Sequence, residues 1–277
     1  MSREAAERAV RDGQLDVALS LLQQQVRERP ADAALRIFLF QLLCVLGQWE
    51  RALAQLNVAA DLDAKALGMA QMYREALQCE ALRREVFRGK KAPMVLGEPD
   101  EWLALLVESL LVRGTAEPQR ADDLRARAFD MAPPSGGTID GAAFEWIADA
   151  DMRLGPVCEA IINGRYYWLP FSRLARIDIE PPVDLRDVVW MPAHFEFTNG
   201  GEGVGLIPTC YQGSHEAGAS ALRLGRETQW TEAGPDVFVG LGQRLLTTDA
   251  GEYPLMEVRS IRFNGAADTA AQADPHA

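Results

Sequence analysis

The chain has 277 residues, of which 48% are hydrophobic and 25% are charged, so it is long enough for one large or two medium globular domains. The 40 acidic residues outnumber the 28 basic residues and give a formal net charge of −12. This balance argues against nucleic acid and against anionic membrane surfaces as partners, because both are bound through clustered lysine and arginine.

The first half of the chain is predicted to be helical, with helices at 2–11, 14–28, 31–46 and 48–62. The segment 31–46 has no internal glycine or proline, and its apolar residues point in almost every direction around the helix axis. Such a helix is either buried between neighbours or spans a membrane, and Arg36 and Gln41 within this short length argue against spanning. Asp32 is the expected N-cap of this helix and Gly47 its expected stop.

A repeat surrounds this central helix. Five positions recur 34 residues later with the same or a similar residue type: Gly13 and Gly47, Leu15 and Trp49, Ala18 and Ala52, Leu19 and Leu53, Leu22 and Leu56. A period of 34 is typical of the tetratricopeptide helix–turn–helix unit, in which glycine ends one helix and a small residue allows close helix packing. The pattern predicts a tetratricopeptide-like array, with an ordinary array of helical hairpins as the alternative.

Further helices are predicted at 64–88, 101–113 and 117–131. The segment 133–138 (PPSGGT) is rich in proline and glycine and is the clearest linker in the chain. We therefore expect a helical domain at 1–132, a β-rich domain at 139–263 and a disordered tail at 264–277.

Beyond the linker, β-branched and aromatic residues alternate with turn signals. Three hairpins are predicted: 157–162 with 165–169 across Asn163-Gly164, 188–197 with 204–207 across 199–201, and 237–247 with 255–263 across 249–251. A single strand is expected at 175–179. Strands at this spacing favour a small barrel or a bent antiparallel sheet, so the fold class is α+β. The glycine series at 200–205 lies between strands and is interpreted as a turn rather than a phosphate loop.

Three residues could form a nucleophilic or metal site: His194, Cys210 and His215. A cysteine–histidine pair requires the base within hydrogen-bond reach of the thiol, and the spacing of these residues matches no zinc pattern. An enzyme with a site built from these three residues is the alternative hypothesis. The leading hypothesis has no catalytic residue, metal or cofactor.

Acidic residues form a group before the first hairpin: Asp149, Asp151 and Glu159. Paired carboxylates can transfer protons or hold a cation. We favour the simpler reading, in which these carboxylates cap turns and pair with arginines.

An aromatic cluster, Tyr166-Tyr167-Trp168, follows the first turn. Alternation along the strand places Tyr166 and Trp168 on the face opposite Tyr167. Exposed tyrosine and tryptophan commonly anchor interfaces, so Tyr166 and Trp168 are secondary candidates for contact with a partner.

Several strings in the second half resemble a known family. They lie at 149–156, 163–171, 182–190, 208–214, 224–230 and 240–244. Together they are similar to the ImpE family, also called SciE or TagJ, an accessory protein of type VI secretion systems, and the similarity covers nearly the whole chain. One difference is Cys210, where the family is expected to carry arginine.

The resemblance implies a bacterial, cytoplasmic and non-enzymatic adaptor that binds the N-terminal helix of the small contractile-sheath subunit. It also implies a link to the AAA+ ATPase that disassembles the sheath. The absence of an apolar signal region, and four cysteines without a CxxC pair, are consistent with the cytoplasm.

Stacked helix pairs form a concave groove that can hold a partner helix. Repeat geometry directs four residues of the central helix toward this groove: Ala34, Ile37, Gln41 and Cys44. The alternative is that Ile37 and Cys44 belong to the core, and docking on the β-rich domain remains open. A structural homo-oligomer is the third functional hypothesis.

Overall fold

The computed structural model describes residues 3–115, 117–234 and 237–265. The predicted tail at 264–277 therefore lies almost entirely outside the described residues. Among the helices that are described, none combines the length and apolar character required to cross a membrane.

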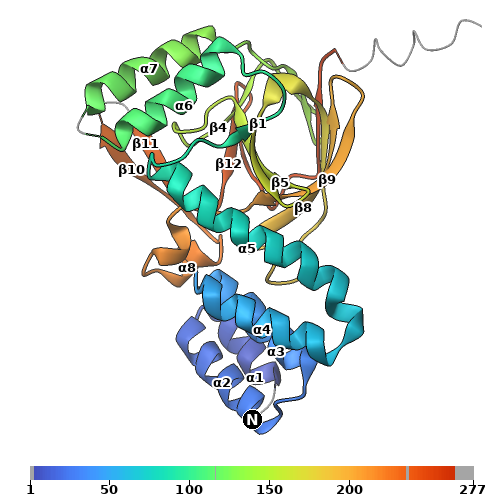
Figure 1. Ribbon diagram of the computed structural model, residues 1–277. Helices are drawn as coiled ribbons and strands as arrows, with labels where there is room; N and C mark the ends of the chain where they lie inside the picture. The colour runs from blue at the N-terminus through green and yellow to red at the C-terminus, as the bar shows by residue number, and fades with distance from the viewer. Residues whose placement is uncertain (1–2, 116, 235–236, 266–277) are drawn as a thin grey trace, which may run out of the picture.

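Helices occupy most of the first half of the chain (Figure 1). They are α1 (Arg3–Arg11), α2 (Leu15–Glu28), α3 (Ala33–Val45), α4 (Trp49–Leu62), η1 (Ala64–Ala66), α5 (Leu67–Phe87), α6 (Glu101–Arg113) and α7 (Pro118–Met131). The short helices η2 (Phe171–Arg173), η3 (Ser214–Glu216) and α8 (Ser220–Arg223) lie between strands. Each predicted helix is present, with bounds within about three residues of the expected ones.

The repeat is confirmed by the geometry of its two turns. Gly13 and Gly47 have φ angles of +72° and +65°, in the left-handed region where glycine is favoured. The amide that follows each glycine donates to the carbonyl five positions earlier, at 2.8 Å after Gly13 and 2.9 Å after Gly47. The Asp32 side chain accepts from the Leu35 amide at 3.1 Å, which confirms the predicted N-cap of α3.

The helices form two groups, α1 to α5 and α6 with α7 (Figure 1). Helices α1 to α4 stack in order, and α5 runs from this stack across the sheet. Helices α6 and α7 pack against each other beside β10 (Thr228–Gly234), where Arg113 donates to the Ala233 carbonyl at 3.2 Å. The helical region 1–132 thus contains an array of α1 to α5 and a hairpin of α6 and α7, which meets the array at the C-terminal end of α5.

The remaining strands are β1 (Met94–Val95), β2 (Gly137–Ile139), β3 (Ala142–Phe144), β4 (Ile147–Asp149), β5 (Val157–Ile162), β6 (Arg165–Pro170), β7 (Leu174–Ile179), β8 (Trp190–Phe197), β9 (Glu202–Pro208), β11 (Val237–Gly242), β12 (Leu245–Thr248), β13 (Glu252–Pro254) and β14 (Ser260–Phe263). The main sheet has the order β1-β6-β5-β9-β8-β7-β14-β2-β3, antiparallel except for β1 with β6. Strands β10 and β11 form a ribbon, and β13-β12-β4 a third sheet. The predicted α+β class is confirmed, with an open bent sheet rather than a closed barrel.

Two of the three predicted hairpins are confirmed. Asn163 and Gly164 have φ angles of +49° and +69° and connect β5 to β6, as the primed turn requires. Strands β8 and β9 pair across the second predicted turn.

The third predicted hairpin is wrong. Its first strand is two strands, because Gly242 has a φ of +92° and interrupts the run between β11 and β12. Strand β11 then pairs with β10, β12 pairs with β4 and β13, and β14 pairs with β2 and β7. The predicted linker also ends early, since its last two residues belong to β2.

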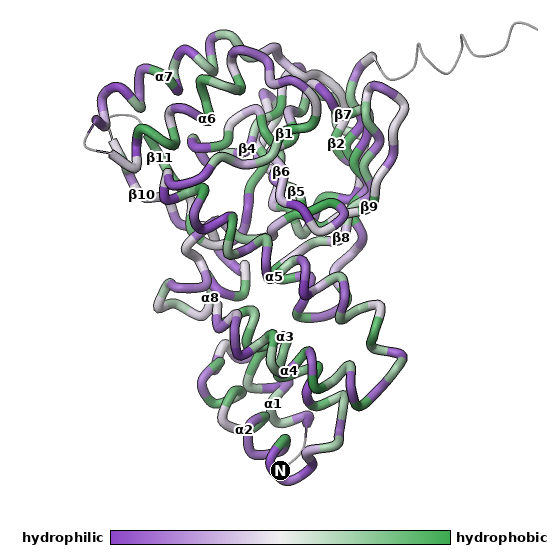
Figure 2. Tube along the Cα trace, viewed as in Figure 1, coloured by the Kyte–Doolittle hydropathy of each residue, from purple (hydrophilic) through white to green (hydrophobic). Residues whose placement is uncertain are grey.

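Two hydrophobic cores hold the molecule together. One lies within the main sheet, lined by the inward side chains of its strands, such as Ile177 and Phe195. The other fills the helical array and continues onto the outer face of β5 and β6, where it includes Tyr166 and Trp168. Helix α3, almost entirely hydrophobic in Figure 2, is the centre of this second core.

Candidate partner-binding site

The inner side of the helical array is filled at one end by the sheet region. The Trp190 ring packs against the rings of Trp49 and Tyr73, with centroid distances of 6.0 and 5.6 Å. The His215 ring meets Trp49 edge-on at 5.3 Å, and its Nδ1 lies 3.1 Å from the Val45 carbonyl oxygen at the end of α3. Aromatic pairs at these distances stabilise the contact beyond the apolar area that they bury.

This packing corrects the expectation that Cys44 faces a partner. The Cys44 thiol is completely buried, and burial, reinforced by the nearby Glu80 carboxylate, raises its pKa well above the usual value. Gln41 is 8% exposed, Ile37 is half-buried and Ala34 is exposed. Only the Ala34 end of the expected groove is therefore open to solvent.

A groove of about 460 Å³ remains open beside this end, and we call it the array groove. Its lining comes from α1, α3 and the connection between β7 and β8: Arg3, Glu7, Val10, Arg11, Phe38, Gln41, Pro182, Val183, Asp184, Leu185 and Val188. Val183 is 87% exposed at its rim. Ile37 lies one turn before Gln41 on α3, so it extends the same surface. Apolar residues flanked by charges of both signs suit an amphipathic helix.

Tyr166 and Trp168 do not contact solvent, so the prediction that they meet a partner is wrong for the folded chain. The Tyr166 hydroxyl donates to the Glu159 carboxylate and accepts from the Trp168 indole at 2.7 Å. Both rings lie between the sheet and α5, where they form part of the core.

A buried ion-pair network joins α5 to the sheet beneath these rings. Arg83 donates from Nε and Nη2 to the two oxygens of Glu159, at 2.7 and 3.0 Å, and from Nη2 to the Cys210 carbonyl at 2.9 Å. Arg244 donates to Glu159 and to Asp149 from the other side. Each of these side chains is at most 3% exposed. Their main role is structural, because every charge has an opposite charge in contact.

Carboxyl pKa values in the network follow from burial and arginine contacts. Burial alone would raise the pKa of Glu159, but Arg83 and Arg244 outweigh it and lower the pKa to about 2. Burial raises the pKa of Asp149 to about 6, and Arg244 only partly opposes this shift. The third member of the acidic group, Asp151, accepts from Arg153 Nε at 2.9 Å. These contacts agree with the interpretation that the acidic group pairs with arginines.

The structure does not assemble the alternative catalytic site. The Cys210 thiol is buried beside the Val188 and Leu222 carbonyls, and burial raises its pKa to about 12. His215 is buried against α3, and burial lowers its pKa to about 4. His194 lies on β8, 3.4 Å from the Glu202 carboxylate. Among the described residues, no hydrogen bond connects Cys210 with either histidine.

One group of side chains has the composition of a metal site: Asp178, His194 and Glu196 offer ligand atoms within 4.8 Å of one another. Arg176 lies among them, with its Nε 2.8 Å from Asp178 and its Nη1 3.6 Å from Glu196. The guanidinium already supplies the positive charge that a metal ion would bring to these carboxylates.

Comparison with known proteins agrees with both halves of the chain. A tetratricopeptide repeat model matches residues 9–76, and the ImpE protein model matches residues 141–262. The type VI secretion system accessory component TagJ of Pseudomonas aeruginosa is 52% identical over 258 residues, covering 93% of this chain and 90% of TagJ. The chain belongs to the ImpE family.

A solved structure extends this ImpE-family similarity to the arrangement of the domains. The crystal structure of protein VPA1032 from Vibrio parahaemolyticus matches with a TM-score of 0.86 at 27% identity. The match covers 96% of this chain and 99% of the other. The helical array and the sheet therefore share one overall arrangement in both proteins.

Sequence reasoning missed the residues that join the two halves of this ImpE-family chain. No sequence pattern singles out Arg83, and Arg244 stands out only as part of the family string at 240–244. Both are buried and neutralise carboxylates that the sequence had identified. One signal was available in the sequence. Glu159 lies within the apolar run of β5, and a carboxylate in a buried strand requires a positively charged partner.

Proposed function

We propose that this protein is a non-enzymatic, cytoplasmic accessory component of a type VI secretion system. The observation that carries the proposal is the 52% identity, over 93% of the chain, to a protein named as such a component. Identity at this level over both halves makes a shared role the simplest inference. The buried Cys210 thiol, with its raised pKa, supports the non-enzymatic part of the proposal.

The partner that we propose is the N-terminal helix of the small contractile-sheath subunit, docked in the array groove. The groove lies between two helices and the 182–188 connection, and its apolar and charged lining suits one face of an amphipathic helix. Ala34 and Ile37 remain accessible next to it, whereas Cys44, Tyr166 and Trp168 are buried. Delivery of sheath subunits to the AAA+ disassembly ATPase is the wider role that this contact would serve.

Isothermal titration of the full chain with a peptide of that helix tests both parts of the proposal. We expect binding to the wild type, and about tenfold weaker binding for Ile37→Glu and for Val183→Asp, since each places a charge on an apolar contact. Val17→Asp on α2 is the matched control, because Val17 is also an exposed valine and lies outside the groove.

The outcomes separate the function from the site. No binding to the wild type at tens of micromolar peptide would overturn the proposed partner. The array groove would be overturned as the docking site if the peptide bound equally strongly to Ile37→Glu, Val183→Asp and Val17→Asp.

A further inference from the structure

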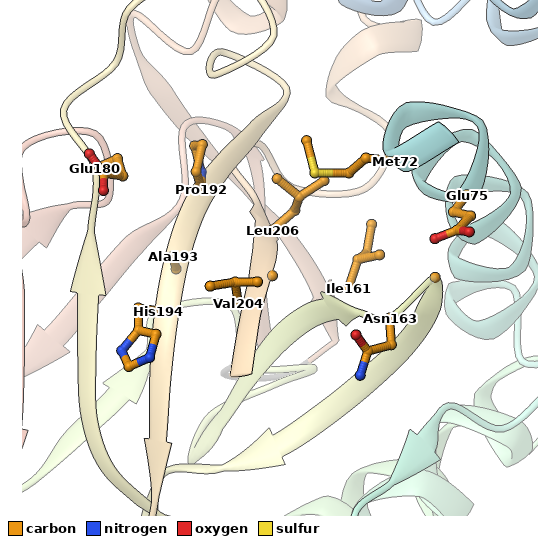
Figure 3. A pocket seen from close by; sticks show the side chains of 12 residues that line it. Met72, Glu75, Ile161, Asn163, Glu180, Pro192, Ala193, His194, Val204 and Leu206 are labelled. Carbon is orange, nitrogen blue, oxygen red and sulfur yellow. The ribbon is translucent and has the colours of Figure 1, made fainter. Parts of the chain in front are cut away.

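A second groove lies between α5 and the strands of the main sheet, and we call it the sheet groove. Figure 3 shows Met72 and Glu75 extending from α5 on one side, with side chains of β5, β8 and β9 opposite them. Its volume is about 340 Å³. Glu180, at the end of β7, lines its far wall, so the connection that borders the array groove begins here.

The floor of the sheet groove is apolar. Ile161 and Leu206 are opposite each other on β5 and β9 and are buried at its base. Above them Met72 is 44% exposed and Val204 is 72% exposed. Exposed methionine and valine beside buried aliphatic residues form a surface on which an apolar side chain of another molecule gains contact area.

The strand that forms this floor also has unpaired backbone. Strand β9 begins at Glu202, whereas β5 ends at Ile162, opposite Gly205. The stretch from Glu202 to Val204 therefore pairs with β8 on one side only. Free amide and carbonyl groups at such an edge can bind a further polypeptide segment.

The walls of the groove are acidic. Glu75 and Glu180 line it, and Asp178 and Glu202 lie next to His194, another lining residue. Glu180 is exposed and has no ion-pair partner within the described part of the chain. Arg176, which precedes Asp178 by two positions on β7, is already engaged by Asp178 and Glu196. The local field therefore favours a positively charged ligand.

The geometry points to a docking surface for a cationic, partly apolar segment of a protein partner. Apolar side chains of the segment contact Met72, Val204 and Leu206, while its lysines or arginines face Glu75 and Glu180. A second copy of this chain fits less well, because its net charge of −12 would be brought against the same carboxylates. This surface is separate from the array groove of the proposed function and does not depend on the sheath-subunit helix.

Fluorescence anisotropy with a labelled synthetic amphipathic peptide of leucine and lysine tests the charge pattern on the full chain. We expect binding that weakens with added salt, and no binding of the same peptide with glutamate in place of lysine. The double variant Glu75→Gln/Glu180→Gln should bind about tenfold more weakly. The double variant Glu4→Gln/Glu145→Gln changes the net charge equally at exposed positions outside the groove and should bind like the wild type.

A second pair of variants tests the exposed apolar side chains of the groove. Val204→Asn should weaken binding, whereas Val17→Asn, another exposed valine, should not. Hydrogen exchange should show protection by the lysine peptide at 202–206 of β9 and at 72–75 of α5. Equal weakening by the groove variants and their controls, or protection confined to other segments, would overturn the inference. The sheath-subunit peptide is absent from this assay, so either proposal can fail alone.

Discussion

Arg83 on α5 donates two hydrogen bonds to the carboxylate of Glu159 on β5, at 2.7 and 3.0 Å, although the two residues are 76 positions apart. The contact connects the helical array to the sheet through a charge pair that water does not reach. Removal of one partner from such a pair leaves the other charge buried and uncompensated.

Arg83→Met should therefore lower the free energy of unfolding by about 3 to 5 kcal/mol, as is typical when one side of a buried pair is removed. Urea denaturation followed by circular dichroism measures the loss. Arg3→Met removes an exposed pair with Glu7 and should change stability little. Similar losses in the two variants would show that the buried network contributes no more than a surface contact.

Acidification should destabilise the protein through His215. Burial lowers the pKa of His215 to about 4 from the usual 6.5, so the unfolded chain binds the proton more tightly between these values. The stability that this neutral histidine contributes is present above pH 6.5 and is lost as the pH falls toward 4, by about 3 kcal/mol in total. Thermal melts at several pH values check this: from pH 6.5 to 4, the melting temperature of the wild type should fall more steeply than that of His215→Gln. An equal fall of the melting temperature in both proteins would show that His215 does not cause the loss of stability.

The two glycines of the repeat offer a matched pair of substitutions. Gly13→Ala and Gly47→Ala both place a Cβ at a positive φ, which costs about 1 to 2 kcal/mol. At Gly47 the added Cβ would also lie 3.0 Å from the His215 Cβ, whereas at Gly13 the nearest atoms are 3.9 Å away. Gly47→Ala should thus lower the melting temperature more than Gly13→Ala. A larger loss for Gly13→Ala would show that the segment containing His215 moves away from the added Cβ at little energetic cost.

Thiol labelling tests the enzyme alternative directly. All four cysteines are buried, and burial raises the pKa values of Cys79, Cys158 and Cys210 to about 12. Native protein should react with iodoacetamide far more slowly than urea-unfolded protein, because few thiolates form and access is blocked. Mass spectrometry of the labelled chain identifies each site. Rapid labelling of Cys210 in the native state would reopen the catalytic hypothesis.

The elements that sequence alone predicted are those specified by local chemistry. The glycine turns at Gly13 and Gly47, the Asp32 cap and the Asn163-Gly164 hairpin each depend on residues within a few positions of one another. Their geometry follows from backbone preferences that the surrounding fold does not override. For this reason the order and type of the helices and the first two hairpins were predicted correctly.

Contacts between segments that are far apart in the sequence had no comparable local signal. The run 237–247 read as one strand, because its interruption depends on the conformation of a single residue, Gly242. Helix periodicity placed Cys44 on the inner face of α3 but did not show that Tyr73 and Trp190 would cover that end of the array. The match between Arg83 and Glu159 likewise involves long-range contacts that no spacing rule encodes.

The way in which Trp190 and His215 occupy the helical array also bears on how interactions of this protein can be mapped. A truncated gene product that stops near residue 132 would lose both of these residues and would present Trp49 and Tyr73 to water. Such a fragment would carry an exposed apolar patch that the full-length chain lacks, and this patch favours non-specific binding in two-hybrid or affinity screens. Deletion mapping is therefore unsuitable for this chain, and point substitutions in the full-length protein are the reliable route.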